Sequence, residues 1–296
     1  MDLAATDATA DFDSSQGTPH MSARYISLAA LFATATAGSL EAQSQCVGCR
    51  ETFAGAIGVG MAVMPRYTGS DEYRFLPIPV VQLEYKGRLF LGSSQSGVGA
   101  GLGAYVIHTA SLSWDVGLSG AESRPESRGD ALAGMGRRDA ASFATTGVTY
   151  RLGSVVANAG AAIGLSNEVG SYGAVGISTE RRIARRWVGG LSTGATFADA
   201  KNMGFEFGVT SSQAAARQAL VASGDPRLEG ISVASFKPDA GLKELRGAVS
   251  LSFLLTERTR LMAFAQNAQL SAEAGRSPLV RSRNSSVAGF AIMRAF

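Results

Sequence analysis

Apolar and polar residues alternate in short stretches along most of this chain, and this alternation limits its possible folds more than any other feature. In residues 111–120, SLSWDVGLSG, the apolar residues Leu112, Trp114, Val116 and Leu118 occupy every second position. Because neighbouring side chains of a strand point to opposite faces, this stretch predicts a β-strand with one apolar face and one polar face. Alternation alone fits both a soluble sandwich and a membrane barrel.

Similar stretches continue to the end of the chain, including a candidate strand at residues 230–236, GISVASF. Tight turns are predicted at Lys86-Gly87, at 108–110, at 152–154 and at 256–259, and longer polar segments cover about residues 68–75, 121–140, 201–226 and 271–284. Residues 211–223 predict a short helix in or beside a loop. We expect about twelve strands, with ten to fourteen allowed and an even number.

The N-terminal region divides into segments of different composition. Residues 1–20 contain four aspartates and no Lys or Arg, and we interpret them as disordered or as a mis-assigned extension before a true start at Met21. Arg24, an apolar run and small residues around Ala42 then have the layout of a secretory signal peptide over residues 21–42. Residues 43–52 are expected to form a short periplasmic segment, and residues 53–296 the barrel.

The overall composition fits an exported membrane protein. Charged residues make up only 17% of the chain, and there are 36 glycines. Beyond residue 42 the chain has 26 Lys and Arg against 19 Asp and Glu, so we expect contact with anionic envelope components and no nucleic-acid partner. No segment beyond the signal approaches eighteen consecutive apolar residues, so a membrane-spanning form would have to be a closed barrel.

The alternation in the C-terminal strand bears on the choice between a soluble sandwich and a membrane barrel. The chain ends at Phe296, and Phe290 and Ile292 share its face, with Arg294 interrupting it. A terminal aromatic residue after an alternating strand resembles the signal that bacterial barrel-assembly machinery recognises. Together with the signal peptide, this pattern predicts an all-β, antiparallel transmembrane barrel in the cell outer membrane. Short turns lie on one side of it, longer loops lie on the other, and Leu112, Trp114, Val116 and Leu118 face lipid.

Four motifs resemble a known family. They are PRYTGSDEYRFLPIP at 65–79, LAGMG at 132–136, FGVTSSQA at 207–214 and SPLV at 277–280, in an order similar to that of the MltA-interacting protein (MipA)/OmpV family of outer-membrane proteins. The motif residues are Pro65, Tyr67, Gly69, Ser70, Asp71, Tyr73, Pro77, Pro79, Gly134, Gly136, Gly208, Gln213, Ser277 and Pro278. We interpret Pro65 as the end of a strand ladder, and Pro77 and Pro79 as holding the chain extended before the next strand.

The resemblance implies a non-enzymatic barrel without a cofactor. It implies a scaffold that brings a murein transglycosylase together with a murein synthase, in peptidoglycan synthesis and envelope maintenance. Family members are also linked to adhesion, osmotic response or antibiotic uptake. A small-solute pore or an adhesin-type barrel is therefore the alternative, and an outer-membrane lipid hydrolase is a remote one.

Few residues offer catalytic chemistry. His108 is the one histidine beyond residue 42, and a hydrolase would need it to activate a serine such as Ser111 or Ser113 within an oriented set. One histidine also excludes a histidine-rich zinc site. Asp71 and Glu72 are adjacent acids, which are more often solvated turn residues than a calcium or acid–base pair.

Two further patterns leave alternatives open. Cys46 and Cys49 form CVGC; Arg50 replaces the histidine of a haem motif, and a local disulfide is favoured over a redox pair or a lipid anchor. RRIARR at 181–186 could bind phosphates of lipopolysaccharide or anionic lipid, or it could be an ordinary basic turn.

Polar-face acids should point into the lumen. Asp115 and Glu84 are expected to pair there with basic residues such as Arg88 or Arg151.

Overall fold

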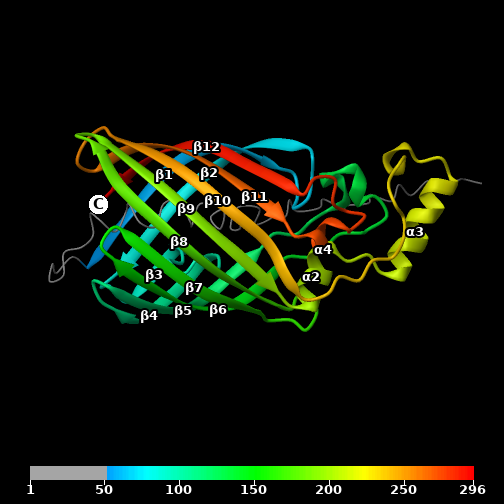
Figure 1. Cartoon of the computed structure of the whole chain (residues 1–296), viewed down its shortest axis with the longest axis horizontal. Coiled ribbons are helices and arrows are strands. Elements are labelled where there is room, and N and C mark those ends of the chain that lie inside the picture. Colours follow the sequence, from blue (N-terminus) through cyan, green and yellow to red (C-terminus); the bar gives the residue numbers. More distant parts are fainter. Residues whose placement is uncertain (1–51) are drawn as a thin grey trace, which may run out of the picture.

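A computed structural model describes residues 52–296, which form a closed antiparallel barrel of twelve strands (Figure 1). Each strand pairs with its sequence neighbours, and β12 pairs with β1 to complete the ring. The strands are β1 (Phe53–Pro65), β2 (Tyr73–Tyr85), β3 (Leu89–Ser93), β4 (Ala100–His108), β5 (Leu112–Ala121), β6 (Ala141–Leu152), β7 (Val155–Gly164), β8 (Ser171–Ala184), β9 (Trp187–Ala198), β10 (Gly241–Leu254), β11 (Thr259–Leu270) and β12 (Asn284–Ala295). The predicted fold and strand number are confirmed. The predicted signal peptide, Cys46 and Cys49 lie outside the described residues.

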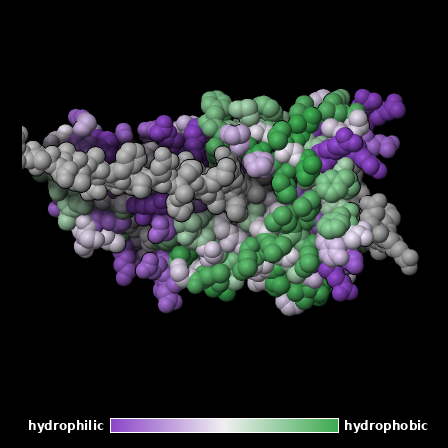
Figure 2. Space-filling view, turned by 180° about the vertical axis from the view of Figure 1, so that it is seen from behind, coloured by the Kyte–Doolittle hydropathy of each residue, from purple (hydrophilic) through white to green (hydrophobic). Residues whose placement is uncertain are grey.

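The alternation seen in the sequence becomes the two faces of the barrel wall. In β5, Trp114, Val116 and Leu118 are exposed on the outside, whereas Ser113 and Asp115 are buried on the inside. Figure 2 shows apolar side chains gathered around the middle of the barrel between polar ends. This arrangement is that of a transmembrane barrel, in which the outward band contacts hydrocarbon. None of the helices among residues 52–296 is long and apolar enough to cross a membrane.

The last strand closes the ring by pairing with β1, and Phe296 extends this pairing. The Phe296 amide donates to the Gly55 carbonyl at 3.0 Å, and the Gly55 amide donates to the Phe296 carbonyl at 3.2 Å. Phe290, Ile292 and Phe296 all point outward, as the alternation predicted. The final strand therefore satisfies the β1 edge, which would otherwise leave unpaired backbone groups in lipid.

The two ends of the barrel differ. At one end, strands are joined by tight turns, and Lys86 and Gly87 both have positive φ, the hairpin geometry expected of this dipeptide. At the other end, long loops carry α2 (Ala200–Phe207), α3 (Ser211–Ala222) and α4 (Ala272–Gly275), with α3 projecting beyond the strands (Figure 1). We call these the short-turn end and the loop end. The predicted helix at 211–223 is confirmed as α3, whereas α2 was not predicted.

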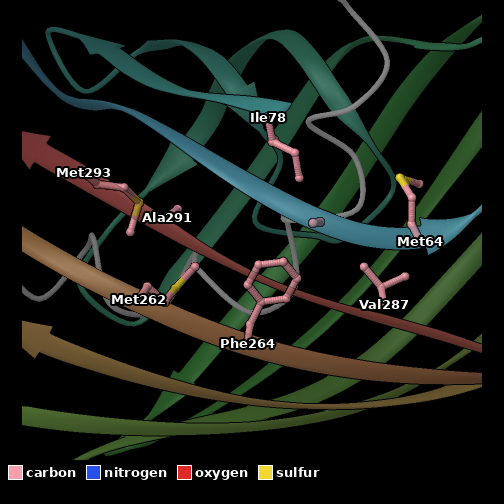
Figure 3. Packing of buried hydrophobic residues seen from close by; sticks show 8 residues of the cluster. Met64, Ile78, Met262, Phe264, Val287, Ala291 and Met293 are labelled. Atoms are coloured by element: carbon pink, nitrogen blue, oxygen red, sulfur yellow. The ribbon is translucent and has the colours of Figure 1, made fainter. Parts of the chain in front are cut away.

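One side of the lumen is apolar. Buried side chains of β1, β2, β11 and β12 pack together there, as Figure 3 shows: Ala62, Met64, Ile78, Met262, Phe264, Val287, Ala291 and Met293. Leu76 and Val80 of β2 pack against this cluster. The barrel interior is thus not the continuous polar surface of a water-filled channel.

The opposite side of the lumen is occupied by residues 94–99, which leave β3 and fold inward. Ser94 donates to the Asp115 carboxylate at 2.9 Å, and the Tyr172 hydroxyl donates to the Val98 carbonyl at 3.0 Å. Gly147 and Gly160 make room for this segment, because a Cβ at Gly147 would lie 2.0 Å from the Ser96 Cβ.

Three sequence interpretations are corrected. Pro77 and Pro79 lie inside β2 and pair opposite Met61 and Val59, so they do not precede the strand. Residues 230–236 form no strand, because their apolar residues pack into the loop end and only Phe236 makes an isolated bridge with Val209. Asp115 does face the lumen, but it accepts a hydrogen bond from Ser94 rather than pairing with Arg88 or Arg151.

The inward segment generates a stability prediction. Gly147→Ala should lower the free energy of unfolding by about 1–3 kcal/mol, since its methyl group would overlap Ser96 and displace residues 94–99. The measurement is the urea midpoint of the protein folded in detergent micelles. Gly247→Ala is the matched control, because a Cβ there meets nothing nearer than 3.9 Å. Equal midpoints for the two variants would contradict the role of the segment.

Candidate functional site: the loop cap

The four family-like motifs, far apart in sequence, meet at the loop end. The Tyr67 hydroxyl donates to the Leu279 carbonyl at 3.0 Å, joining the first motif to the fourth. The Ser277 hydroxyl donates to the Phe207 carbonyl at 2.6 Å, joining the fourth to the third. Gln213 completes the set by donating its amide to the Met135 carbonyl of the second motif at 2.9 Å. We call this assembly, residues 66–72, 122–140, 199–240 and 271–283, the loop cap.

The first motif makes a tight turn after β1. The Ser70 amide donates to the Tyr67 carbonyl at 3.0 Å, and the Ser70 hydroxyl accepts from the Glu72 amide at 3.1 Å. Gly69 has a φ of +92°, and a Cβ there would lie 2.8 Å from Val280. Its carbonyl accepts from the Arg281 amide at 2.7 Å. Glycine at this position therefore lets the first and fourth motifs pack against each other.

Apolar side chains fill the cap. One cluster joins Tyr67 to Leu132, Met135, Val209 and Leu279, and a second joins Met203 and Phe207 of α2 to Leu270, Ala274 and Ala198. Burial of this apolar surface stabilises the cap as a packed unit rather than a set of separate loops.

Arg217 is a central cap residue that sequence reasoning missed. It is fully buried on α3 and donates to the carbonyls of Ala131 at 2.7 Å and Ser232 at 3.1 Å. Gly134, with a φ of +75°, packs directly against its side chain. An arginine three residues after Ala214, on the buried face of a helix, was the available signal. Its role as a donor to loop carbonyls depends on the tertiary structure.

A group of charged side chains lies within the cap. Arg138 forms an ion pair with the Glu206 carboxylate at 2.8 Å and stacks over the Phe205 ring at 4.5 Å. Arg124 donates to the Glu206 backbone carbonyl at 2.8 Å. Burial by itself would raise the pKa of Glu206, but the positive charges of Arg138, Lys243 and Arg124 outweigh it and lower the pKa to about 2. Burial and the nearby Asp71 carboxylate raise the pKa of the Tyr67 hydroxyl to about 12, so it stays a hydrogen-bond donor at neutral pH.

The remaining motif residues divide between the cap and the wall. Asp71 lies 4.0 Å from Arg281 within the cap, and the Tyr73 hydroxyl accepts from the Ser286 amide at 3.2 Å at the start of the wall. Gly208 ends α2, its amide donating to the Gly204 carbonyl at 2.8 Å. Also at the loop end are Pro65, Gly136 and Pro278, whereas Phe296 lies at the short-turn end and Pro77 and Pro79 lie within β2.

The candidate catalytic residues do not form a catalytic arrangement. His108 is exposed at the end of β4 and packs against the Tyr105 ring at 4.2 Å. The Ser113 hydroxyl donates to the Gln95 side chain at 3.0 Å. Glu72 pairs with Arg66 at 3.1 Å. No group of three or more metal-binding side chains of His, Cys, Asp or Glu type occurs within residues 52–296.

A closed barrel with an apolar outer band, tight turns at one end and long packed loops at the other defines an outer-membrane β-barrel protein. The chain belongs to the MipA family: the family model described as MltA-interacting protein MipA matches residues 57–296. The resemblance read from the four motifs is therefore confirmed. No curated protein matches the chain.

Several solved outer-membrane proteins match the chain at low sequence identity. The outer-membrane channel DcaP of Acinetobacter baumannii is 10% identical over 82% of this chain and 96% of that one, with a TM-score of 0.39. The toluene transporter TodX of Pseudomonas putida is 9% identical over 92% and 98%, with a TM-score of 0.36. OprB of the same species is 14% identical over 74% of this chain, which spans 59% of its length, with a TM-score of 0.36.

The pKa of Glu206 generates a pH prediction. An unfolded glutamate titrates near 4.5, so the lowered pKa stabilises the folded cap above about pH 4.5, and this stabilisation is lost as the pH falls to about 2. Hydrogen exchange of the α2 amides, corrected for the intrinsic pH dependence of exchange, should accelerate over this window. In Glu206→Gln, the α2 amides should exchange faster at neutral pH and without this pH dependence. The reason is that the buried arginines no longer have an acidic partner. The exposed Glu229→Gln is the control, and identical profiles for all three proteins would contradict the assignment.

Proposed function

We propose that this protein is a non-enzymatic outer-membrane scaffold that binds a murein transglycosylase, and with it a murein synthase, through its short-turn end. The family description, MltA-interacting protein, supports a protein partner of this kind. The observation that carries the proposal is the charge of the short-turn end, which faces the periplasm in barrels of this class. In the same proposal, residues 1–42 are removed during export, and residues 43–52 lead into the barrel from the periplasmic side.

The short-turn end has an excess of exposed positive charge. We call its exposed basic residues the basic rim: Lys86, Arg88, Arg181, Arg182, Arg185, Arg186, Arg258 and Arg294. Glu257 is the exposed acid among them. In the loop cap, by contrast, arginines face acids, as in Arg66 with Glu72 and Arg138 with Glu206. An unbalanced charged rim attracts an anionic partner surface and accelerates its association.

The location of residues 181–186 also favours one of the partners predicted from the sequence. Residues 181–184 end β8 and residues 185–186 form the turn to β9, at the short-turn end. Lipopolysaccharide occupies the outer leaflet, which is the loop-end side of such a barrel. The position therefore supports a periplasmic partner more than lipopolysaccharide.

The other functions have weaker support. A small-solute pore would need an open water-filled lumen, whereas the packed cap, the inward residues 94–99 and the apolar cluster around Met262 and Phe264 favour a closed one. A hydrolase would need His108 to activate a serine, and the nearby Ser113 hydroxyl bonds to Gln95 instead. The non-enzymatic interpretation is thus favoured.

A binding experiment tests the scaffold. Purified protein in nanodiscs should retain a purified murein transglycosylase, and reversing four charges with R181E/R182E/R185E/R186E should weaken binding at least tenfold and reduce its salt dependence. R137E, which reverses an exposed arginine of the loop cap, is compared with the single reversal R185E at the rim and should leave binding unchanged. Failure of the native protein to bind transglycosylase or synthase at low salt would overturn the proposal.

Conductance tests the closed lumen. The native protein in a planar bilayer should show no steady ion current, because the cap and residues 94–99 obstruct the lumen. Replacing residues 95–98 with a Gly-Gly linker should raise the frequency of open events. A stable open channel in the native protein would favour the pore and count against the scaffold.

A further inference from the structure

The barrel wall has one incomplete seam. Strand β2 pairs with β1 along its full length but with β3 only from Leu83 to Tyr85. Within residues 52–296, positions 75–81 of β2 have no strand partner on the β3 side, because the chain folds into the lumen after Ser93. The Gln82 side chain ends the ladder, accepting from the Ser93 amide at 3.0 Å. We call residues 75–81 the open edge.

The hydrogen-bond register shows why the open edge contains two prolines. Gly55 exchanges hydrogen bonds with Phe296, so the odd-numbered residues of β1 point their amides toward β12. The odd-numbered residues of β2 that lie opposite them include Pro77 and Pro79. Their backbone nitrogen and carbonyl groups therefore point away from β1 and toward the open edge. Proline has no amide donor, so these positions present no N–H there. A β-strand added at this edge would lack two backbone hydrogen bonds of a complete ladder, which disfavours a strand-pairing partner here.

Both faces of the open edge are apolar. Phe75 and Val81 are exposed on the outside with the two prolines between them. On the inside, Ile78 belongs to the apolar lumen cluster (Figure 3), and Leu76 and Val80 pack against it. The edge therefore connects the lipid-facing surface with an apolar strip of the lumen, with no intervening row of charged residues in β2.

A cationic group lies at the loop-end limit of the open edge. The Nε atom of Arg74 is buried without a hydrogen-bond partner, and its Nη2 atom lies 3.8 Å from the Glu122 carboxylate. That carboxylate already accepts from Arg128 at 2.9 Å. Two arginines thus share one acid, which leaves a net positive charge and donor capacity for an anion.

We propose that the open edge is a lateral binding site that admits the acyl chain of an anionic amphiphile from the membrane into the lumen. The chain would enter beside Leu76 and Val80, the partly buried inward residues that border the apolar lumen cluster, and the phosphate or carboxylate headgroup would bind Arg74. A lipid-like ligand fits better than a peptide strand, because the prolines remove backbone donors while the surroundings are apolar. This site is independent of the basic rim, which lies at the opposite end of β2.

Photolabelling of the native protein in nanodiscs tests the site. Two probes carry a diazirine near the end of an acyl chain, one a fatty acid and the other an anionic phospholipid. Labelled positions are mapped by mass spectrometry. Insertion at the inward residues Leu76 or Val80 supports lateral entry. Labelling there by the fatty acid identifies a carboxylate headgroup, and labelling by the phospholipid identifies a phosphate headgroup. Labelling confined to outward residues such as Val59, Phe75 and Leu118 with both probes overturns lateral entry.

A pair of variants tests the headgroup position. Arg74→Gln should reduce inward labelling at least threefold without changing outward labelling, since only the anchored chain depends on the charge. Arg137→Gln removes an exposed cap arginine and should change neither. Unchanged inward labelling in Arg74→Gln would overturn the assignment of Arg74. Transglycosylase binding should persist in Arg74→Gln, so that failure of this site and failure of the scaffold proposal are distinguishable.

Discussion

The structure depends on one constraint: backbone amides and carbonyls inside a membrane must find partners within the protein. Twelve strands satisfy it by closing into a ring, and the bonds between Phe296 and Gly55 extend the pairing of β12 with β1. The same constraint applies at the incomplete seam beside β2, where backbone groups have no neighbouring strand. Pro77 and Pro79 remove donors along the part of the wall that lacks a neighbouring strand, which lowers the number of groups left unpaired.

The inward fold of residues 94–99 links the seam to the lumen. The residues that leave the wall there fill the opposite side of the interior, where Gly147 and Gly160 leave room for Ser96 and Val98. The lumen is therefore divided into a side lined by polar contacts to Asp115 and a side lined by Met262, Phe264 and their neighbours. The cap, held by Arg217 and the Arg138–Glu206 pair, covers the loop end.

The two ends of the barrel have different electrostatic characters for the same physical reason. Buried charge must be paired, so the packed cap sets arginines against acids or backbone carbonyls. The tight turns bury little, and their basic residues can remain exposed. The proposed association with a protein partner rests on this exposed rim and on the covered lumen.

The strands of the barrel wall could be predicted from the sequence, because period-two alternation and turn dipeptides are local signals. The sequence also predicted α3, whose capping box is contained in Thr210 and Gln213. Long-range packing assembles the four motifs into one cap, buries Arg217 among loop carbonyls, and leaves residues 230–236 without a strand partner along their length. These features arise from contacts between residues distant along the chain, and no local pattern encodes them. The early departure of β3 from the wall likewise depends on Gly147 and Gly160, which lie on other strands.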